Sequence, residues 1–331
     1  MKLVRYHITP RSAFRTPLKS DTLTGQLLCL YREKNGEDAL KKLLKEIIEG
    51  NPPFILSDVF PYNTLPLPVM PPIPRVSFQK IAERQFEGKM FDALSAQKRL
   101  KKQLAWISLS DWMDLRMGLS SAALFTKYCK QDHSLNLTNS SKTLQIHNTI
   151  SRSTGRTLEN GGIYTMANQW YFPVDSNNPT MDLYVLIRDD FQSDLSELFS
   201  MLEATGYGAD NTTGKGHMEL RAADSTPDLT SRPEAKNKGM AYWLNLSTYS
   251  TTQGDKLEGF YKIKTKFGKV WNGFGEMNPF KWPLLTFESG SVFRQCPENL
   301  SHTVIRGVHA NPDIIQCTMP IMIPFLLEEA P

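Results

Sequence analysis

Hydrophobic and polar residues alternate at the start of the chain. Valine, tyrosine and isoleucine occupy every second position of the segment 2–8, a period of two that predicts a β-strand. Leucines then recur at helical spacing from Asp21 onward, with Ser20 as the expected N-cap. A second helical pattern runs from about Asp38 to Glu49, where a Gly-Asn-Pro-Pro sequence ends it. The first fifty residues therefore predict one strand and two helices.

Six prolines lie in the segment 61–74. Because proline lacks an amide hydrogen and fixes its own φ angle, we expect this segment to be extended and to lie on the surface. A helical pattern follows over about 91–106 and carries a basic cluster, whose simplest interpretation is a solvated helix face. The cluster consists of Lys98, Arg99, Lys101 and Lys102.

Strand patterns dominate after residue 143. One helix interrupts them, with Ser193 as the expected cap and an end near Gly206. A strand–helix–strand–strand order in both halves of the chain predicts an α+β fold built from two units of ferredoxin-like type. The expected strands cover about 143–150, 163–174, 181–188, 240–249, 260–267, 284–288, 292–295 and 318–325.

Composition narrows the class of protein. The 331 residues suffice for about two domains, and 40% hydrophobic with 22% charged residues argue against disorder. No apolar run approaches the ~18 residues of a membrane-spanning helix, and the first ten residues lack the apolar stretch of a secretory signal. Four cysteines without a C-x-x-C pair are typical of a reducing cytoplasm and argue against a cysteine zinc site.

The net charge of +4 conceals an uneven distribution. Residues 1–20, 133–158 and 259–275 hold twelve basic residues and no acidic one, which leaves 26 basic against 34 acidic residues elsewhere. An acidic body with basic segments is the pattern of a polyanion-binding surface. Chance clustering of charge on solvated faces is the alternative. In the third segment, Lys262, Lys264 and Lys266 share one face of the expected strand, and their role stays open between RNA and partner contact.

A glycine-rich string occupies residues 206–216. Glycines let backbone amides approach phosphate oxygens, and Lys215 adds charge. The string does not fit the nucleotide-binding P-loop, because five residues separate Gly208 from Gly214 and Gly216 replaces the magnesium-binding Ser or Thr. We therefore expect backbone contacts with phosphate rather than nucleotide hydrolysis. Turns that need a positive φ angle are the alternative explanation for the glycines.

Two further strings suit an RNA backbone. Residues 147–156 combine histidine, two arginines and several hydroxyl groups at the end of an expected strand, although an ordinary exposed hairpin tip could have the same composition. In the segment 9–25, Arg11, Arg15 and Lys19 precede a helix N-terminus that itself favours anions.

Catalytic and metal-binding patterns are missing. The six histidines show no H-x-x-x-H spacing, and no G-x-S-x-G string surrounds a serine. No cofactor or metal is therefore expected. His7 or His147 could act as a general base in metal-free RNA cleavage, but a lone histidine in a strand is more often a polar partner. Asp210 is expected to shape a turn.

Together, six strings resemble one family along the chain from residue 9 to about 293. They are TPRSAFRTPLKSDTLTGQL, PPFILSDVFP, LPLPVMPP, HNTISRSTG, GYGADNTTGKG and GSVF. In this order they resemble Csm-complex subunit four, the RAMP protein of type III-A CRISPR interference complexes. Two positions depart from the pattern: His217 stands where an arginine is expected, and the VHANPDI string only loosely matches the closing segment.

The resemblance implies a fold and a set of partners. It implies two ferredoxin-like, RRM-related domains. Residues 1–180 would form the first, with the proline-rich segment 61–74 and a β-hairpin thumb at about 143–170. Residues 181–331 would form the second, with the glycine-rich loop 206–216. Expected partners are the five-prime handle of the CRISPR RNA, the large polymerase-like subunit, the repeated backbone RAMP subunit and, indirectly, the target RNA, with no membrane.

The expected function is that of a non-catalytic, cytoplasmic RNA-binding subunit in antiviral defence. Its rivals are a RAMP endoribonuclease that processes precursor CRISPR RNA with a histidine base, and a subunit that contacts only proteins. The residues expected to contact RNA are Arg11, Arg15, Lys19, His147, Asn148, Arg152, Thr154, Arg156, Gly208, Gly214, Lys215 and Gly216.

Overall fold

The first sheet joins strands that are far apart in the sequence. In the computed structural model, which describes residues 1–129, 139–158, 160–175, 179–233, 239–252, 257–270 and 278–328, the chain is a mixed α+β protein. Its first sheet has the order β2-β7-β1-β8, with every neighbouring pair antiparallel. The strands are β1 (Lys2–Pro10), β2 (Phe54–Pro61), β7 (Met181–Ile187) and β8 (Met218–Ala222).

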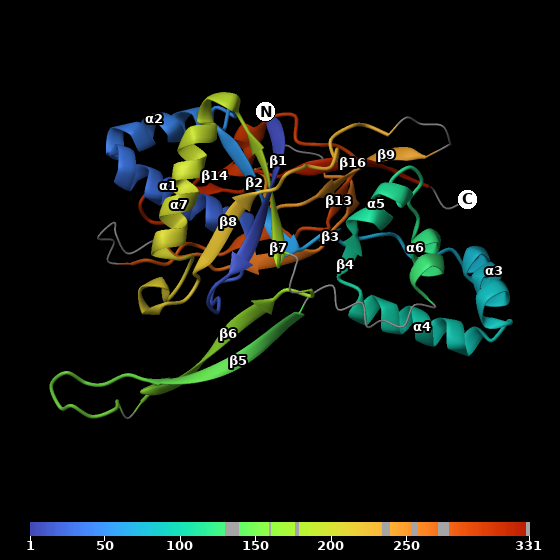
Figure 1. The fold of residues 1–331 in the computed structure, drawn as a ribbon, viewed down its shortest axis with the longest axis horizontal. Helices are drawn as coiled ribbons and strands as arrows, with labels where there is room; N and C mark the ends of the chain where they lie inside the picture. Colours follow the sequence, from blue (N-terminus) through green and yellow to red (C-terminus); the bar gives the residue numbers. More distant parts are fainter. Residues whose placement is uncertain are drawn as a thin grey trace.

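Helices α1 (Ser20–Asn35) and α7 (Gln192–Thr205) cover one face of this sheet (Figure 1). The Tyr6 and Phe199 rings meet edge to face at 4.9 Å between centroids, on the strand face that the alternation predicts to be buried. Helix α2 (Glu37–Ile48) packs against α1. Along the chain, the strands of this sheet and the two helices that cover it follow in the order β1, α1, β2, β7, α7 and β8.

The pairing of β1 bears on the expected division of the chain at residue 180. Both neighbours of β1, namely β7 and β8, come from the half assigned to the second domain. A boundary between residues 180 and 181 would divide this sheet. Helix α7, which belongs to the expected second domain, also covers the first sheet. The first sheet therefore combines elements from both expected domains.

A second sheet has the order β10-β13-β9-β16. Its strands are β9 (Met240–Asn245), β10 (Gly259–Phe260), β13 (Val292–Phe293) and β16 (Met322–Leu327). Between residues 239 and 328 the described residues form no α-helix, only a 3-10 turn at Leu300–Thr303. Helix α5 (Leu109–Leu115) lies against β16 instead, because Trp112 meets Phe325 edge to face at 5.5 Å.

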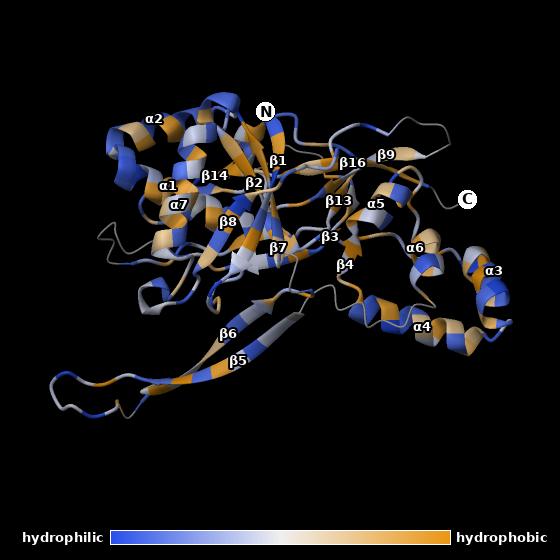
Figure 2. Cartoon of the chain, in the orientation of Figure 1, coloured by the Kyte–Doolittle hydropathy of each residue, from blue (hydrophilic) through white to orange (hydrophobic). Residues whose placement is uncertain are grey.

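The proline-rich segment is partly buried and not wholly a surface segment. Its residues Thr64–Pro66 form β3, which pairs with β4 (Trp106–Ser108), and Leu65 is fully buried. Three more helices follow the segment: α3 (Arg75–Phe86), α4 (Met90–Gln103) and α6 (Ser121–Tyr128). Figure 2 shows mixed hydropathy on α3 and α4, at the edge of the molecule.

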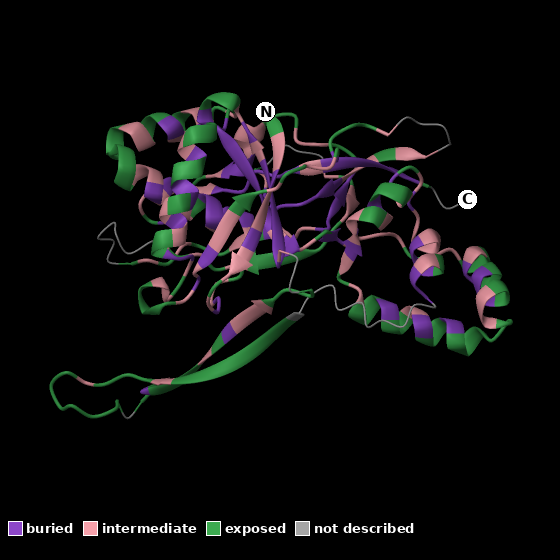
Figure 3. Cartoon of the chain, in the orientation of Figure 1, coloured by how far each residue is buried: buried purple, intermediate pink, exposed green. Residues whose placement is uncertain are grey.

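A long hairpin extends from the body (Figure 1). Strands β5 (Asn139–Asn148) and β6 (Ile163–Phe172) pair over ten residues, from Asn139 opposite Phe172 to Asn148 opposite Ile163. Most of the hairpin is exposed (Figure 3). The expected hairpin at about 143–170 is therefore present.

Two short ribbons complete the second half: β11 (Ile263–Lys266) with β12 (Leu284–Phe287), and β14 (Val304–Ile305) with β15 (Gln316–Cys317). Buried side chains from both sheets form one hydrophobic cluster. Within the described ranges, no helix combines the length and the apolar character needed to span a membrane.

Candidate nucleic-acid interface

The basic segment 11–19 and the glycine-rich loop 206–216 lie side by side. The Arg11 and Ser12 amides donate to the His217 carbonyl at 2.8 and 3.2 Å, and the Gly216 amide donates to the Ala13 carbonyl at 2.9 Å. Two strings that are about 200 residues apart therefore form one local structure. At the position where an arginine was expected, the backbone of His217 holds the two segments together.

The base of the hairpin joins the same structure. Phe14 and Gln169 exchange two backbone hydrogen bonds of 2.8 Å, and the Phe14 ring lies between Tyr171 at 5.9 Å and Tyr207 at 6.3 Å. We call residues 11–19, 169–172 and 206–216 together the junction. It brings the segment that carries Arg11, Arg15 and Lys19 next to the loop that carries Lys215 and the glycines.

A cavity of about 220 Å³ opens beside the junction. An apolar cavity of ~150 Å³ is enough to admit benzene, so this one has room for a planar aromatic ring. Aromatic and aliphatic side chains dominate its wall, and the ammonium-bearing Lys19 lies among them. The lining residues are Pro17, Leu18, Lys19, Val59, Pro61, Trp106, Tyr171, Phe172, Val174, Thr180 and Met181.

Lys19 is fixed by a buried carboxylate. Its Nζ lies 2.7 Å from Oδ2 of Asp58, whose side chain is 2% exposed. Burial by itself would raise the pKa of Asp58, but the Lys19 charge and hydrogen bonds to Lys19 and Ser20 lower it below its usual value. Burial would likewise lower the pKa of Lys19, but Asp58 raises it. Both groups are therefore held in their charged forms.

Asp58 also caps α1, a role that the sequence assigned to Ser20. The Ser20 amide donates to Asp58 Oδ1 at 2.9 Å, and the same oxygen accepts the Thr248 hydroxyl at 3.0 Å. The Ser20 hydroxyl accepts the Thr248 amide instead of capping the helix. The prediction of Ser193 as the cap of the later helix was also wrong, because α7 already begins at Gln192 and its N-cap residue, Phe191, makes no side-chain cap hydrogen bond.

The Asp58 interaction should make stability depend on pH in a defined window. Because the folded-state pKa of Asp58 lies below the unfolded value, its contribution is present above about pH 4 and is lost as the pH falls through the folded pKa. We expect Asp58→Asn to be less stable than the parent protein at pH 7, and this gap to shrink below pH 4. Urea unfolding of both proteins at pH 7, 5 and 3 measures the difference in their free energies of unfolding. An equal difference at all three pH values would contradict the role of the Asp58 charge.

The two arginines of the junction are paired with carboxylates. Arg11 lies 2.6 Å from Glu219, with its side chain 58% exposed, and Arg15 pairs with Asp210 of the glycine-rich loop. An exposed pair such as Arg11–Glu219 is weak, so its guanidinium can exchange the carboxylate for a phosphate. Asp210, with a positive φ of 63°, both shapes the turn and holds Arg15.

The glycine-rich loop does not present its glycine amides to a ligand. The Gly208 amide donates to Gln26 Oε1 at 3.0 Å, the Gly214 amide to Asn211 at 3.0 Å and the Lys215 amide to Asp210 at 3.2 Å. With Gly216 bound to Ala13, the backbone-phosphate contacts predicted for these residues would require broken hydrogen bonds. The Lys215 ammonium remains available, because it has no ion-pair partner among the described residues.

Packing explains two of the glycines better than phosphate binding. A Cβ on Gly208 would lie 2.6 Å from Cβ of Thr16, and a Cβ on Gly216 would lie 2.0 Å from the Tyr207 carbonyl oxygen. Both residues have φ near +74°. Gly208 is therefore required by the close approach of Thr16 from the 11–19 segment, and Gly216 by the close approach of Tyr207 within the loop itself.

The hairpin tip forms a second, separate basic group. The six residue steps from Gln169 to Ile163 span about 20 Å along the strand, which places the tip away from the junction. His147 stacks on Tyr164 at 5.5 Å. Arg152 and Arg156 are exposed in the loop and form no ion pair with any described residue.

Asn148 and Thr154 take part in the structure of the tip. The Asn148 side chain donates to Thr157 Oγ1 at 3.4 Å, and the Thr154 amide donates to Ser151 Oγ at 3.4 Å. The Ser151 amide also donates to the Arg156 carbonyl at 2.8 Å. These turns hold the two arginine side chains toward solvent.

The third basic segment is largely structural. Lys266 pairs with the fully buried Asp21 and lies 2.7 Å from Thr22 Oγ1, both in α1. Lys264 lies 3.9 Å from Glu288. Lys262 retains no ion-pair partner among the described residues. Residues 271–275 of this segment, and 133–138 of the second, lie outside the described residues.

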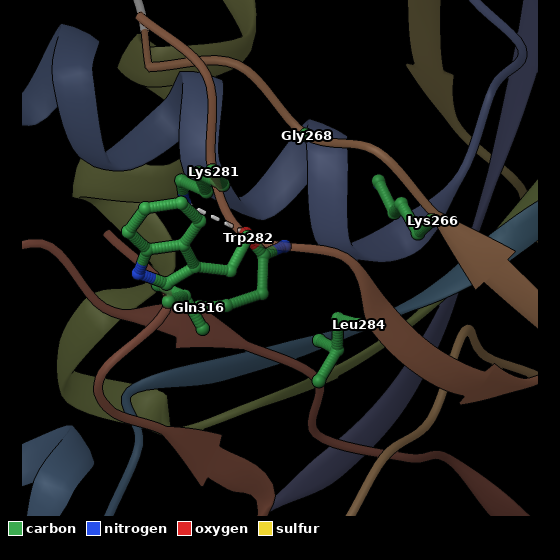
Figure 4. Close-up of a pocket in the computed structure, with 7 residues that line it drawn as sticks. Lys266, Gly268, Lys281, Trp282, Leu284 and Gln316 are labelled. Atoms are coloured by element: carbon green, nitrogen blue, oxygen red, sulfur yellow. Dashed lines mark hydrogen bonds between the residues drawn. The ribbon is translucent and has the colours of Figure 1, made fainter. Parts of the chain in front are cut away.

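A second lysine lies half-buried next to this contact. Lys281 donates to Gln316 Oε1 at 2.7 Å and to the Ile315 carbonyl at 3.0 Å, beside Trp282 and Leu284 (Figure 4). Burial lowers the pKa of Lys281. This pocket holds its lysine with protein oxygens and leaves little room for a ligand.

His7 is oriented by a buried carboxylate. Its Nδ1 lies 2.8 Å from Oδ1 of Asp182, which is fully buried and whose other oxygen accepts Arg5 Nη2 at 2.6 Å and the Asn63 amide at 2.7 Å. The Tyr62 ring lies 5.5 Å from the imidazole. His147 has no such carboxylate among the described residues. In the described ranges, no group of three metal-ligating side chains comes together.

The aromatic wall of the cavity was not predicted from the sequence. Trp106, Tyr171 and Phe172 line it, and none is among the residues expected to contact RNA. The available signal was the aromatic run at 170–172, which ends the second strand of the hairpin. Trp106 had no local signal, because only the β3–β4 pairing brings it to the cavity.

Comparison with solved structures places this arrangement among known folds. A chain in the crystal structure of a Csm1–Csm4 cassette with AMPPNP matches 99% of this chain and 99% of its own length, with a TM-score of 0.58 and 14% identity. A chain in a Csm3–Csm4 subcomplex of the type III-A CRISPR-Cas interference complex matches 98% and 99%, with a TM-score of 0.56 and 15% identity. Csm4 is common to both. The chain has the fold of a Csm4-like subunit.

The resemblance found in the sequence strings is thus confirmed at the level of the fold. A third match, a chain in the crystal structure of a Csm1–Csm4 cassette in complex with cA4, has a TM-score of 0.58, 13% identity, and coverage of 99% of both chains. No family model and no curated protein sequence matches the chain.

Proposed function

We propose that this chain is a non-catalytic, cytoplasmic subunit of a type III-A CRISPR effector complex that holds the five-prime handle of the CRISPR RNA. It would bridge the large polymerase-like subunit and the backbone subunits. The Csm4-like fold over the whole chain supports membership of such a complex. The first sheet with α1 and α7 would be a ferredoxin-like RAMP domain, and the β5–β6 hairpin its thumb.

The cavity at the junction is the observation that carries the proposal. Proteins recognise single-stranded RNA by stacking splayed bases on aromatic side chains and by pairing phosphates with cations. Trp106, Tyr171 and Phe172 supply the aromatic wall, and Lys215 supplies a cation without an ion-pair partner among the described residues on the adjoining loop. A handle nucleotide would place its base in the cavity and its phosphate against Lys215.

The hairpin tip would take the next phosphates along the RNA. The two tip arginines have no competing carboxylate among the described residues, so they can bind phosphate without first breaking an ion pair. Arginine also offers a planar, bidentate contact. The tip and the junction together would fix the handle at two points about 20 Å or more apart.

Reversing the tip charges should weaken RNA binding. We expect Arg152→Glu/Arg156→Glu to lower the affinity of the assembled complex for handle RNA at least about tenfold, because each phosphate contact contributes on the order of 1.5 kcal/mol. The slope of log affinity against log salt should fall by about 1.4, at ~0.7 per phosphate of a single strand. Fluorescence anisotropy of labelled handle RNA at several salt concentrations measures both values.

Arg75→Glu/Lys80→Glu on α3 makes the same charge change on an exposed surface remote from the junction, and serves as the control. If both variants lost the same affinity for handle RNA, the effect would come from the net charge of the protein and not from the hairpin tip. An unchanged affinity in the tip variant would remove the hairpin from the RNA site. Crosslinking of handle RNA to α2 rather than to the junction or tip would overturn the whole assignment.

A ribonuclease is the second candidate, and the Asp182–His7 contact favours it. A histidine oriented by a buried carboxylate can act as a general base on the 2′-hydroxyl of RNA. Incubating the purified chain with repeat RNA decides between the candidates. Intact RNA is the expected result; specific cleavage that His7→Ala abolishes would establish the enzyme instead.

A further inference from the structure

Two arginines meet one glutamate at one edge of the first sheet. Strand β8 forms this edge (Figure 1), and its antiparallel register with β1 places Glu219 opposite Thr9 and Arg221 opposite His7. Paired residues of such a ladder extend their side chains from the same face of the sheet. Successive residues alternate between the faces, and Tyr6 packs on α7. Glu219 and Arg221 therefore extend from the face opposite to α7.

Glu219 holds both arginines. Its Oε1 accepts Nε and Nη2 of Arg11 at 2.9 and 2.6 Å, and its Oε2 lies 3.5 Å from Nη2 of Arg221. The Arg221 side chain is 81% exposed, even more than that of Arg11. We call these three residues the edge cluster. Two positive charges share one negative charge there, so the cluster retains a net positive charge.

The geometry of the edge cluster is that of an anion site. Both guanidinium groups direct N–H donors at one carboxylate, and a phosphate can accept such donors in the same way. Exposed ion pairs of this kind are weak, so an incoming anion can replace the carboxylate. A phosphodiester carries the same single negative charge as the carboxylate and likewise has two free oxygens.

The edge cluster adjoins the junction. The Arg11 amide donates to the His217 carbonyl at 2.8 Å, where the glycine-rich loop ends, and β8 begins with the next residue. Arg11 thus belongs to both groups, while Glu219 and Arg221 carry the polar surface further along β8. An RNA strand held in the junction has the edge cluster directly beside it.

We propose that the edge cluster binds a phosphodiester of RNA and that Glu219 is a built-in competitor for this site. The inference rests on the proposed function, because the phosphodiester is taken to belong to the handle RNA held in the junction. Before RNA binds, the carboxylate keeps the two guanidinium groups directed at one point. The phosphodiester then takes its place between Arg11 and Arg221, and the exchange costs affinity. Removing the carboxylate should therefore strengthen RNA binding.

An acidic protein segment fits the edge cluster less well. Its carboxylates would have to displace a chemically identical group that is already tethered beside both arginines at high effective concentration. A phosphodiester of an RNA that is anchored in the junction is tethered as well, so it competes on equal terms. The arginine forks then favour the phosphate, which they bind through two parallel hydrogen bonds.

Binding of labelled handle RNA to the assembled complex tests the exchange. We expect Glu219→Gln to raise the affinity about three- to fivefold, because it frees two guanidinium groups from an exposed ion pair. Arg221→Gln should lower the affinity about threefold, since one phosphate contact is lost while Glu219 still competes for Arg11. Adding Arg221→Gln to Glu219→Gln should reduce the gain. Fluorescence anisotropy at several salt concentrations measures these values, and the gain should diminish as salt screens the charges.

Matched controls lie on other elements. Glu197→Gln removes an exposed carboxylate from α7, on the opposite face of the first sheet, and Arg84→Gln removes an exposed arginine from α3. Both should bind handle RNA like the parent complex. The residues of the edge cluster lie at the surface, so we expect their variants to unfold at the parent temperature, and thermal unfolding verifies that they fold.

An unchanged or weaker RNA affinity of Glu219→Gln would overturn the proposal. So would an equal gain in Glu197→Gln, because the effect would then come from the net charge of the protein. Tighter subunit assembly with unchanged RNA affinity would assign the edge cluster to an acidic protein segment instead. A parent complex that assembles but binds no handle RNA is a different result, which would refute the proposed function on which this inference rests.

Discussion

Asp182→Ala is expected to lower the free energy of unfolding by about 3–5 kcal/mol, the usual cost of removing one partner of a buried ion pair. Arg5 is 7% exposed and has Asp182 as its carboxylate partner at 2.6 Å. Without the carboxylate, the guanidinium stays buried in the centre of the first sheet. The Asn63 amide also loses its acceptor.

Urea unfolding of Asp182→Ala and His7→Ala tests this expectation. The imidazole is 22% exposed and forms only one of the Asp182 contacts, so we expect His7→Ala to cost about 1 kcal/mol. Arg5→Met with Asp182→Leu should recover much of the loss, because apolar residues of similar volume can replace a buried ion pair. Equal and small effects of the two single variants would show that Arg5 reaches solvent without its partner.

Gly216→Ala is expected to have the second largest effect, about 2–4 kcal/mol. A methyl group there would lie 2.0 Å from the Tyr207 carbonyl oxygen, with backbone rather than a flexible side chain as the obstacle. The residue also has φ of 74°, which costs about 1 kcal/mol for alanine. The two effects should separate Gly216 from Tyr207, which are joined within the loop by a 2.9 Å backbone hydrogen bond.

Gly214→Ala provides the matched control for Gly216→Ala. Its φ is 84°, but nothing lies within 4 Å of the added methyl group. We expect a cost of about 1 kcal/mol, and the difference between the variants measures the steric part alone. Amide hydrogen exchange of Tyr207 and Gly216 should accelerate only in Gly216→Ala. Equal stability of the two variants would show that the backbone at residue 216 can move away from Tyr207 at little cost.

Local elements could be predicted from the sequence because their signals are local. The first strand, both helices before residue 50 and the hairpin lie close to where their periodicity placed them. Partnership between strands was not predictable in this way. Periodicity reports which face of a strand is apolar, but β1 pairs with β7 and β8, whose residues follow it by about 180 and 210 positions.

Ion pairs between residues far apart in the sequence were unpredictable for the same reason. Counting charge in short windows treats Lys19, Arg15 and Lys266 as free cations. Their carboxylates lie 39, 195 and 245 residues away along the chain. Only the fold reveals that these pairs form, and it leaves the hairpin tip and Lys215 as the cations that remain available among the described residues of the expected site.

The order of strands in the first sheet has a consequence for biosynthesis. Strand β1 is the first element made, yet both of its neighbours are the last strands of this sheet to be made, with β8 ending at Ala222. At a synthesis rate of ~5–20 residues per second, β1 waits about 10–45 s for its partners. During that time its unpaired edges are open to other chains. Newly made protein should therefore depend on chaperones, or on early capture by its complex, more than its final stability would indicate.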